Sequence, residues 1–81
     1  MRVTVRLFAR LRELAGRESW PIDVSPGATA ADAWQAVTQT SPALAPFGRA
    51  ISVAINTNFA RMSHPLAEGD DVAFLPPVSG G

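Results

Sequence analysis

The last two residues of this 81-residue chain, Gly80 and Gly81, are the ones best suited to covalent chemistry. Glycine has no Cβ, so the narrow channel of another protein can close around the backbone and reach a terminal carboxylate. Pro76 and Pro77 have fixed φ angles and favour extended geometry in the residue before them, which predicts a stiff spacer ahead of the glycines. Residues 76–81 would span at most about 20 Å. We therefore expect an extended tail whose reactive group is the Gly81 carboxylate, the alternative being a frayed end without function.

The other side chains offer little further chemistry. There is no cysteine, and hence no disulfide, thiol nucleophile or thiolate metal ligand. All seven basic residues are arginines, so no side-chain amine is available for a Schiff base or for receiving an isopeptide bond. The single histidine, His64, precedes Pro65 in a loop-like stretch and is interpreted as a turn residue. We expect no catalytic residue, no metal site and no bound cofactor, and no enzyme activity of the chain on its own.

Composition restricts the classes of partner. Seven arginines balance seven acidic residues, and a net charge of zero argues against nucleic acid as the main partner, because phosphate binding needs a concentrated basic surface. Four arginines gather early, and we interpret them as a solvated face: Arg2, Arg6, Arg10 and Arg12. No apolar run approaches the roughly 20 residues of a membrane span, and residues 1–7 alternate instead of forming the apolar core of a signal peptide. We expect a cytoplasmic protein without a membrane partner.

Alternating hydrophobic residues predict two strands in the first third of the chain, over residues 2–8 and 18–24. Between them, apolar residues at helical spacing from Leu11 onwards indicate a short turn or helix that Gly16 ends. Pro21 lies inside the second run, which points to an edge strand or a bulge, because proline cannot donate to a sheet ladder.

The clearest helix signal follows at Thr29. Thr29 is a good N-cap, and Asp32 three residues later completes an approximate capping box. An apolar stripe at helical spacing should face the core, with Trp34 as its largest anchor: Ala30, Ala33, Trp34 and Val37. We expect this helix to end near Gln39.

The remainder of the chain alternates loops and strands. Residues 41–50 contain two prolines and a glycine and are predicted to be a loop. Alternation predicts a strand over residues 51–55, a short return strand over 59–62 and a final strand over 72–75, with a loop and turn over 64–70.

This order of elements predicts an α+β domain, with a mixed sheet of four to five strands packed on one main helix. The second strand should run antiparallel to the first, and the last strand should run parallel to the first at the centre of the sheet. Such an arrangement is the β-grasp, or ubiquitin-like, fold. We expect residues 1–75 to form this domain and residues 76–81 to form the C-terminal tail.

Three large apolar residues are candidates for a surface that binds a partner. The alternation of the first strand places Phe8 on the face opposite the core, and Leu75 should point outwards if Phe74 is buried. Phe59 follows an asparagine-rich turn in an uncertain environment. Phe8, Phe59 and Leu75 could form one apolar patch with Arg12 at its rim, the alternative being that each packs locally.

Two segments resemble a known family. Residues 64–81, HPLAEGDDVAFLPPVSGG, are similar to the ending HPL-x-x-GD-x-V-A-F-x-PPV-x-GG of the small subunit of molybdopterin synthase, a ubiquitin-like sulfur carrier. Residues 7–16, LFARLRELAG, are similar to the same family near its start. The resemblance covers both ends and the order of elements between them.

The resemblance implies a definite chemistry. An activating enzyme of the ubiquitin-E1-like type would use ATP to adenylate Gly81, and a sulfur donor would convert the adenylate to a thiocarboxylate. The charged carrier would then insert its tail into the large, catalytic subunit, where sulfur passes to the cyclic pyranopterin precursor during molybdenum-cofactor biosynthesis. The residues that would thread into the partner are Pro76, Pro77, Val78, Ser79 and Gly80.

Three other functions stay open. A carrier of this kind could deliver sulfur to thiamine, cysteine or tRNA, although the Pro-Pro-Val-Ser approach and the chain length favour molybdopterin. A ubiquitin-like modifier would be attached to target lysines through Gly81. A plain binding module would have an inert tail.

Overall fold

The computed structural model describes residues 1–77, so Val78, Ser79, Gly80 and Gly81 of the predicted tail lie outside the described residues. The elements follow in the order β1 (Arg2–Leu7), α1 (Ala9–Ala15), β2 (Ser19–Asp23), α2 (Ala30–Thr40), the 3₁₀ helix η1 (Pro42–Phe47), β3 (Ser52–Ile55), β4 (Asn58–Ala60) and β5 (Asp71–Leu75). The division into a domain over residues 1–75 and a tail over 76–81 stays a prediction.

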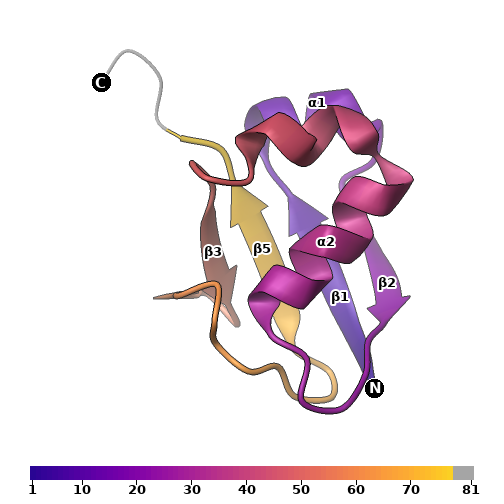
Figure 1. Ribbon diagram of the computed structural model, residues 1–81, viewed down its shortest axis with the longest axis vertical. Coiled ribbons are helices and arrows are strands. Elements are labelled where there is room, and N and C mark those ends of the chain that lie inside the picture. The colour runs from indigo at the N-terminus through magenta and orange to yellow at the C-terminus, as the bar shows by residue number, and fades with distance from the viewer. Residues whose placement is uncertain (78–81) are drawn as a thin grey trace.

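The five strands form one mixed sheet in the order β2-β1-β5-β3-β4 (Figure 1). β5 lies at the centre and runs parallel to β1, whereas the β1–β2, β3–β4 and β3–β5 pairs are antiparallel. α2 crosses one face of the sheet, and α1 and η1 lie at the end towards which β1 and β5 run. The predicted β-grasp arrangement, with a central last strand parallel to the first, is confirmed.

The core lies between the sheet and α2. Alternate residues of the two central strands point into it, and each is at most 1% exposed: Val3, Val5, Leu7, Val72 and Phe74. The rings of Trp34 and Phe74 meet there with their centroids 5.0 Å apart, tilted by 60°, an arrangement within the range favoured by aromatic pairs. Because side chains alternate between the two faces of a strand, the intervening residues of β1 and β5 point to the opposite face of the sheet.

α2 begins as its sequence predicts. Thr29 is the N-cap, and both halves of the capping box form, because the Asp32 N–H donates to Thr29 and the Thr29 N–H donates to Asp32. The predicted stripe is buried on the sheet, and the helix ends at Thr40, one residue beyond the expected end. Capping satisfies backbone donors that otherwise have no partner in the first turn of a helix.

The region after α2 differs from its prediction. Residues 41–50 were expected to be a loop, but Pro42–Phe47 forms the 3₁₀ helix η1. Pro42 occupies the start of this helix, where a missing N–H costs nothing, and Leu44 is fully buried against the core. Pro42 and the buried Leu44 therefore favour a short helix that packs on the core, and the helix accommodates Pro46.

Pro21 lies in the edge strand β2, opposite Thr4 of β1. The expectation of an edge position is thus confirmed. The expected early helix is also present as α1, which ends at Gly16 in a left-handed conformation.

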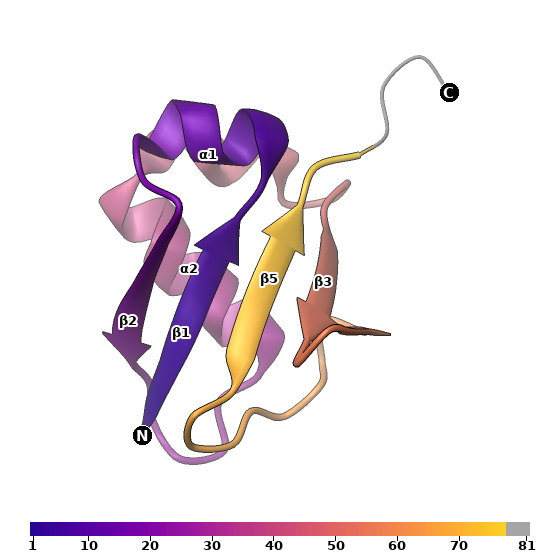
Figure 2. The same cartoon turned by 180° about the vertical axis from the view of Figure 1, so that it is seen from behind.

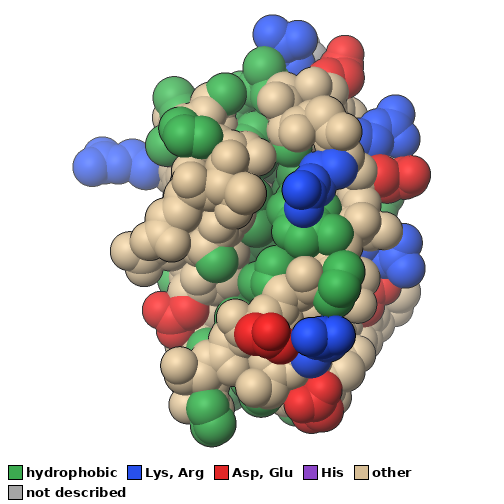
Figure 3. Space-filling view, turned by 90° about the vertical axis from the view of Figure 1, so that its right-hand side faces the viewer, with side chains coloured by type: hydrophobic (Ala, Val, Ile, Leu, Met, Phe, Trp, Pro, Cys, Tyr) green, Lys and Arg blue, Asp and Glu red, His purple; other side chains and the backbone are tan. Residues whose placement is uncertain are grey.

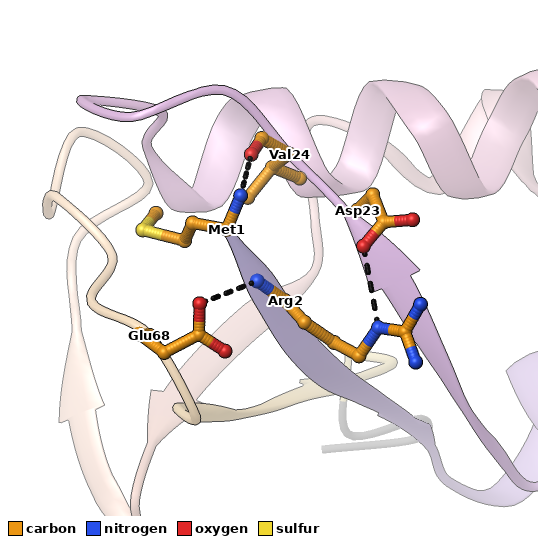
Figure 4. A network of polar contacts seen from close by, with 5 residues as sticks. All are labelled: Met1, Arg2, Asp23, Val24 and Glu68. Atoms are coloured by element: carbon orange, nitrogen blue, oxygen red, sulfur yellow. Dashed lines mark hydrogen bonds and ion pairs between the residues drawn. The ribbon is translucent and has the colours of Figure 1, made fainter.

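The start of β1 is held from two sides (Figure 4). The Met1 amino group donates to the Val24 carbonyl at 2.9 Å, and Arg2 Nε donates to Asp23 Oδ1 at 3.2 Å. On the other side, the Arg2 backbone N–H donates to Glu68 Oε1 at 3.1 Å. These contacts join the start of β1 to β2 and to the loop that leads into β5, and so they bring β5 alongside β1.

Figure 3 shows the side of the molecule on which β2 lies, where positive and negative side chains alternate around a band of hydrophobic ones. Among the half-buried apolar residues is Trp20, whose ring lies 4.5 Å beneath the Arg17 guanidinium. This face therefore offers no single-sign patch for a polyanion. Among residues 1–77, no helix has the length and apolar character needed to cross a bilayer.

Candidate functional site

The face of the sheet opposite α2 carries an apolar hollow. Figure 2 shows the sheet from this side, with α2 behind it and α1 at the end of the sheet. The hollow has a volume of about 440 Å³, and eight residues from β1, β3, β4, β5 and adjoining segments line it: Arg6, Phe8, Ala54, Thr57, Phe59, Asp71, Ala73 and Leu75. It therefore brings together the predicted Phe8, Phe59 and Leu75.

The two phenylalanines are the exposed aromatic walls of this hollow. Phe8 is 43% exposed and continues the extended geometry of β1, with φ −123° and ψ 153°, which keeps it on the outer face. Phe59 is 77% exposed and pairs across the β3–β4 ladder with Ala54. Large apolar side chains exposed around a concave surface are typical of protein-binding sites.

Small side chains form the floor between these walls. Ala54 and Ala73 are register partners on β3 and β5, and Leu75, two residues beyond Ala73 on the same face, is half-buried. The alternation of β5 predicts that Ala73 and Leu75 point outwards together. The floor that Ala73 forms with Ala54 was not predicted from the sequence. The sequence feature that could have predicted this floor is an alanine at an outward position of each strand. Such small side chains leave room for a side chain of a partner.

An ion pair that the sequence reasoning missed forms another part of the lining. Arg6 Nε donates to Asp71 Oδ1 at 2.9 Å and to Oδ2 at 2.8 Å, and both side chains are more than one-third exposed. The residues are 65 positions apart but lie on the neighbouring strands β1 and β5. Because exposed ion pairs contribute only about 0–1 kcal/mol, this pair shapes the hollow more than it stabilises the fold.

Arg12 is not among the residues that line the hollow. It belongs to α1, and its Nη1 is 3.7 Å from Glu18 Oε1. The structure therefore does not place Arg12 among the lining residues, and a contact between this side chain and a partner stays a prediction.

The hollow lies beside the point at which the chain leaves the sheet. Leu75 is the last residue of β5, and Pro76 and Pro77 follow it without regular secondary structure, with Pro77 exposed. A protein that covers the hollow would consequently lie next to the segment leading to Gly81. The threading role of residues 76–80 stays a prediction, and Val78, Ser79, Gly80 and Gly81 lie outside the described part of the chain.

The single histidine and the acidic side chains form no further site among the described residues. The His64 N–H donates to the Arg61 carbonyl at 2.9 Å, and the His64 carbonyl accepts from Ala30 at 3.0 Å, which confirms its place in a turn. Within residues 1–77, no three carboxylate or imidazole side chains lie close enough to hold a metal ion.

The fold and the hollow define a β-grasp protein with an apolar hollow next to the point where its last strand ends. Residues 5–81 match the ThiS family, and the chain belongs to this family. The molybdopterin synthase sulfur carrier subunit of Escherichia coli is 35% identical over 80 residues, covering 98% of this chain and 99% of the relative. This match confirms the resemblance seen in residues 7–16 and 64–81.

Two further relatives bear on function. The small archaeal modifier protein 1 of Haloferax volcanii is 39% identical over 84 residues, covering 94% of this chain and 97% of the relative. Its crystal structure superposes with a TM-score of 0.85 over the whole of both chains. A complex of subunits 1 and 2 of the molybdopterin-converting factor from Helicobacter pylori contains a chain 27% identical, with a TM-score of 0.68 over the whole of both chains.

Proposed function

We propose that this chain is the sulfur carrier subunit of a molybdopterin synthase and that it carries sulfur as a thiocarboxylate on Gly81. The observation that supports this most directly is the hollow formed by Phe8, Phe59 and Leu75 beside the exit of the Pro76–Gly81 segment. A protein seated there would lie beside Leu75, from which the chain continues towards Gly81. The near full-length match to the carrier subunit of Escherichia coli supports the same reading.

The carrier chemistry begins with activation of the Gly81 carboxylate. A carboxylate is a poor electrophile, so an E1-like enzyme uses ATP to join it to AMP, releasing pyrophosphate. A sulfur donor then attacks the acyl carbon, and AMP leaves with one of the former carboxylate oxygens. The product is a thiocarboxylate, whose sulfur is delivered to the cyclic pyranopterin precursor in the active site of the large subunit.

The side-chain inventory suits this role. Because the chain contains no cysteine, the terminal carbonyl is the one place at which it can carry sulfur covalently. Because it contains no lysine, an activated copy cannot acylate the side-chain amines of other copies. In this proposal the chain is a cosubstrate of the synthase in the cytoplasm and supplies no catalytic group of its own.

The large catalytic subunit is the proposed occupant of the hollow. Support comes from the two-subunit complex of Helicobacter pylori, whose matching chain has the same fold. An apolar partner surface that displaces water from Phe8 and Phe59 would provide binding energy, because burial of apolar area is the main favourable term in association.

Reconstitution tests this proposal. The full chain, its E1-like enzyme, a sulfur donor, ATP, the large subunit and the pterin precursor should together form molybdopterin. Deletion of Gly81 should abolish product formation and leave the circular dichroism spectrum and the melting temperature unchanged, since the last strand of the sheet ends at Leu75. Product formation at the normal rate by the Gly81-deleted chain would contradict the proposal.

A second function has specific support, because the small archaeal modifier protein 1 of Haloferax volcanii is 39% identical to this chain. In that case Gly81 would be joined to lysine amines of other proteins. Tagged chain recovered from cells under denaturing conditions would then carry target proteins through bonds that resist thiols. The carrier hypothesis predicts the free chain under the same conditions.

A further inference from the structure

Six of the described residues adopt a left-handed backbone conformation, and they fall into two groups. The glycines Gly16, Gly27 and Gly69, with φ of 73°, 86° and 85°, are absent from the lining of the hollow. The non-glycine residues Ala9, Asn56 and Thr57, with φ of 52°, 52° and 74°, lie beside the exposed phenylalanines. Ala9 follows Phe8, and Asn56 and Thr57 precede Phe59 by three and two residues.

Thr57 is the most unusual member of this set. It is the second residue of the two-residue turn between β3 and β4, which Ile55 and Asn58 close as register partners. Two-residue hairpin turns with positive φ at both positions favour Asn-Gly, because glycine has no Cβ to clash in the left-handed region. A β-branched residue is the least suited to this position, so threonine strains the backbone where glycine would not.

Among residues 1–77, no side-chain hydrogen bond compensates for the strained backbone of Thr57. Its side chain is exposed, and within residues 1–77 its hydroxyl makes no hydrogen bond. Asn56 differs, because its amide donates to Asp70 Oδ1 at 2.9 Å and its Oδ1 accepts from the Asp71 N–H at 2.9 Å. Asn56 therefore has a structural role in this turn, whereas the Thr57 side chain has none among the described residues.

The Thr57 side chain does have a place on the candidate docking surface. It lines the hollow together with Phe8, Phe59 and Leu75. The turn that carries Thr57 joins β3 to the edge strand β4, so Thr57 lies at the border of the sheet. Strained residues that the fold does not need are found preferentially at functional sites.

We propose that Thr57 is a specificity-determining contact for the large synthase subunit, an inference that rests on the proposed function. Its methyl group extends the apolar wall formed by Phe59, and its hydroxyl offers a donor and an acceptor at the rim. The matching partner surface is an apolar projection that fills the hollow, bordered by a polar group that pairs with the Thr57 hydroxyl. Threonine at this position makes the free carrier less stable and the complex tighter.

The substitution Thr57→Gly separates these two effects. Removal of the strained side chain should raise the melting temperature of the free chain by several degrees. The same change should weaken binding to the purified large subunit by about fivefold or more, measured by isothermal titration calorimetry with the full-length chain. A residue with a purely structural role would change the melting temperature and leave the affinity unchanged.

Ala9→Gly is the matched control, because it relieves the same kind of backbone strain and Ala9 does not line the hollow. This variant should also melt at a higher temperature, with unchanged affinity. Equal weakening by Ala9→Gly and Thr57→Gly would assign the effect to backbone flexibility and overturn the proposal. Unchanged affinity or a lower melting temperature for Thr57→Gly would also overturn it.

Phe59→Ala distinguishes failure of this inference from failure of the proposed docking surface. If Phe59→Ala weakens binding and Thr57→Gly does not, the docking surface stands and the role of Thr57 is wrong. If neither change affects binding, the large subunit does not use the hollow, and both proposals fail.

Discussion

At the scale of single residues, exposure separates the phenylalanines into two roles. Phe74 is fully buried against Trp34, whereas Phe59 is 77% exposed on an edge strand of only three residues. Removal of the Phe74 ring would leave a cavity, but removal of the Phe59 ring takes away surface that water already contacts. The free energy of unfolding should therefore depend on Phe74 and the partner affinity on Phe59.

Phe59→Ala is the direct test of this separation. We expect its affinity for the large subunit to fall by at least about tenfold, because aromatic anchors in an interface are frequent binding hot spots. Its melting temperature should stay within about 4 °C of the parent value, since substitutions at exposed positions usually change stability by less than about 0.5 kcal/mol. Surface plasmon resonance and differential scanning calorimetry measure the two quantities. A large loss of thermal stability would show that Phe59 is part of the core.

At the scale of elements, short sequence patterns were sufficient to predict those helices and strands that form through neighbouring residues. Alternation identified β1 and β5, and Thr29 with Asp32 marked the start of α2. The same reasoning missed η1, because Pro42 and Pro46 signal a loop and the burial of Leu44 that makes a helix favourable depends on the rest of the fold.

The candidate site was less accessible to sequence reasoning, for physical reasons. The alternation of side chains along the first and last strands predicted that Phe8 and Leu75 point outwards. The Arg6–Asp71 pair, however, joins residues 65 positions apart, and no local sequence pattern connects them. The left-handed conformation of Thr57 could not be foreseen, because a β-branched residue normally avoids it. Contacts between residues of distant strands, and strained backbone conformations, become visible only in the assembled sheet.

The capping box gives a prediction at this scale. Thr29→Ala removes the side-chain oxygen that accepts from the Asp32 N–H, so the free energy of unfolding should fall by about 1 kcal/mol. Urea denaturation measures this loss. Thr29 does not line the hollow, so calorimetric titration with the large subunit should show an unchanged affinity. An unchanged urea midpoint would mean that the capping box does not contribute to stability.

At the scale of the whole molecule, the β-grasp topology assigns different tasks to the two faces of one sheet. One face holds the core against α2, and the other presents the hollow. β5 takes part in both, because Phe74 is buried in the core while Ala73 and Leu75 border the hollow, and it then leads into Pro76. The central strand of the sheet thus connects the candidate docking surface to the proposed sulfur-bearing end.

The central claim is that Gly81 carries sulfur, and intact-mass analysis tests it most directly. Chain purified without thiol or amine reagents from cells with an active molybdenum-cofactor pathway should contain a species heavier by the exchange of one oxygen for one sulfur. Fragmentation should place this change on Gly81, and deletion of Gly81 should remove it. A chain found only as the unmodified carboxylate, or joined to lysines of other proteins, would contradict the account.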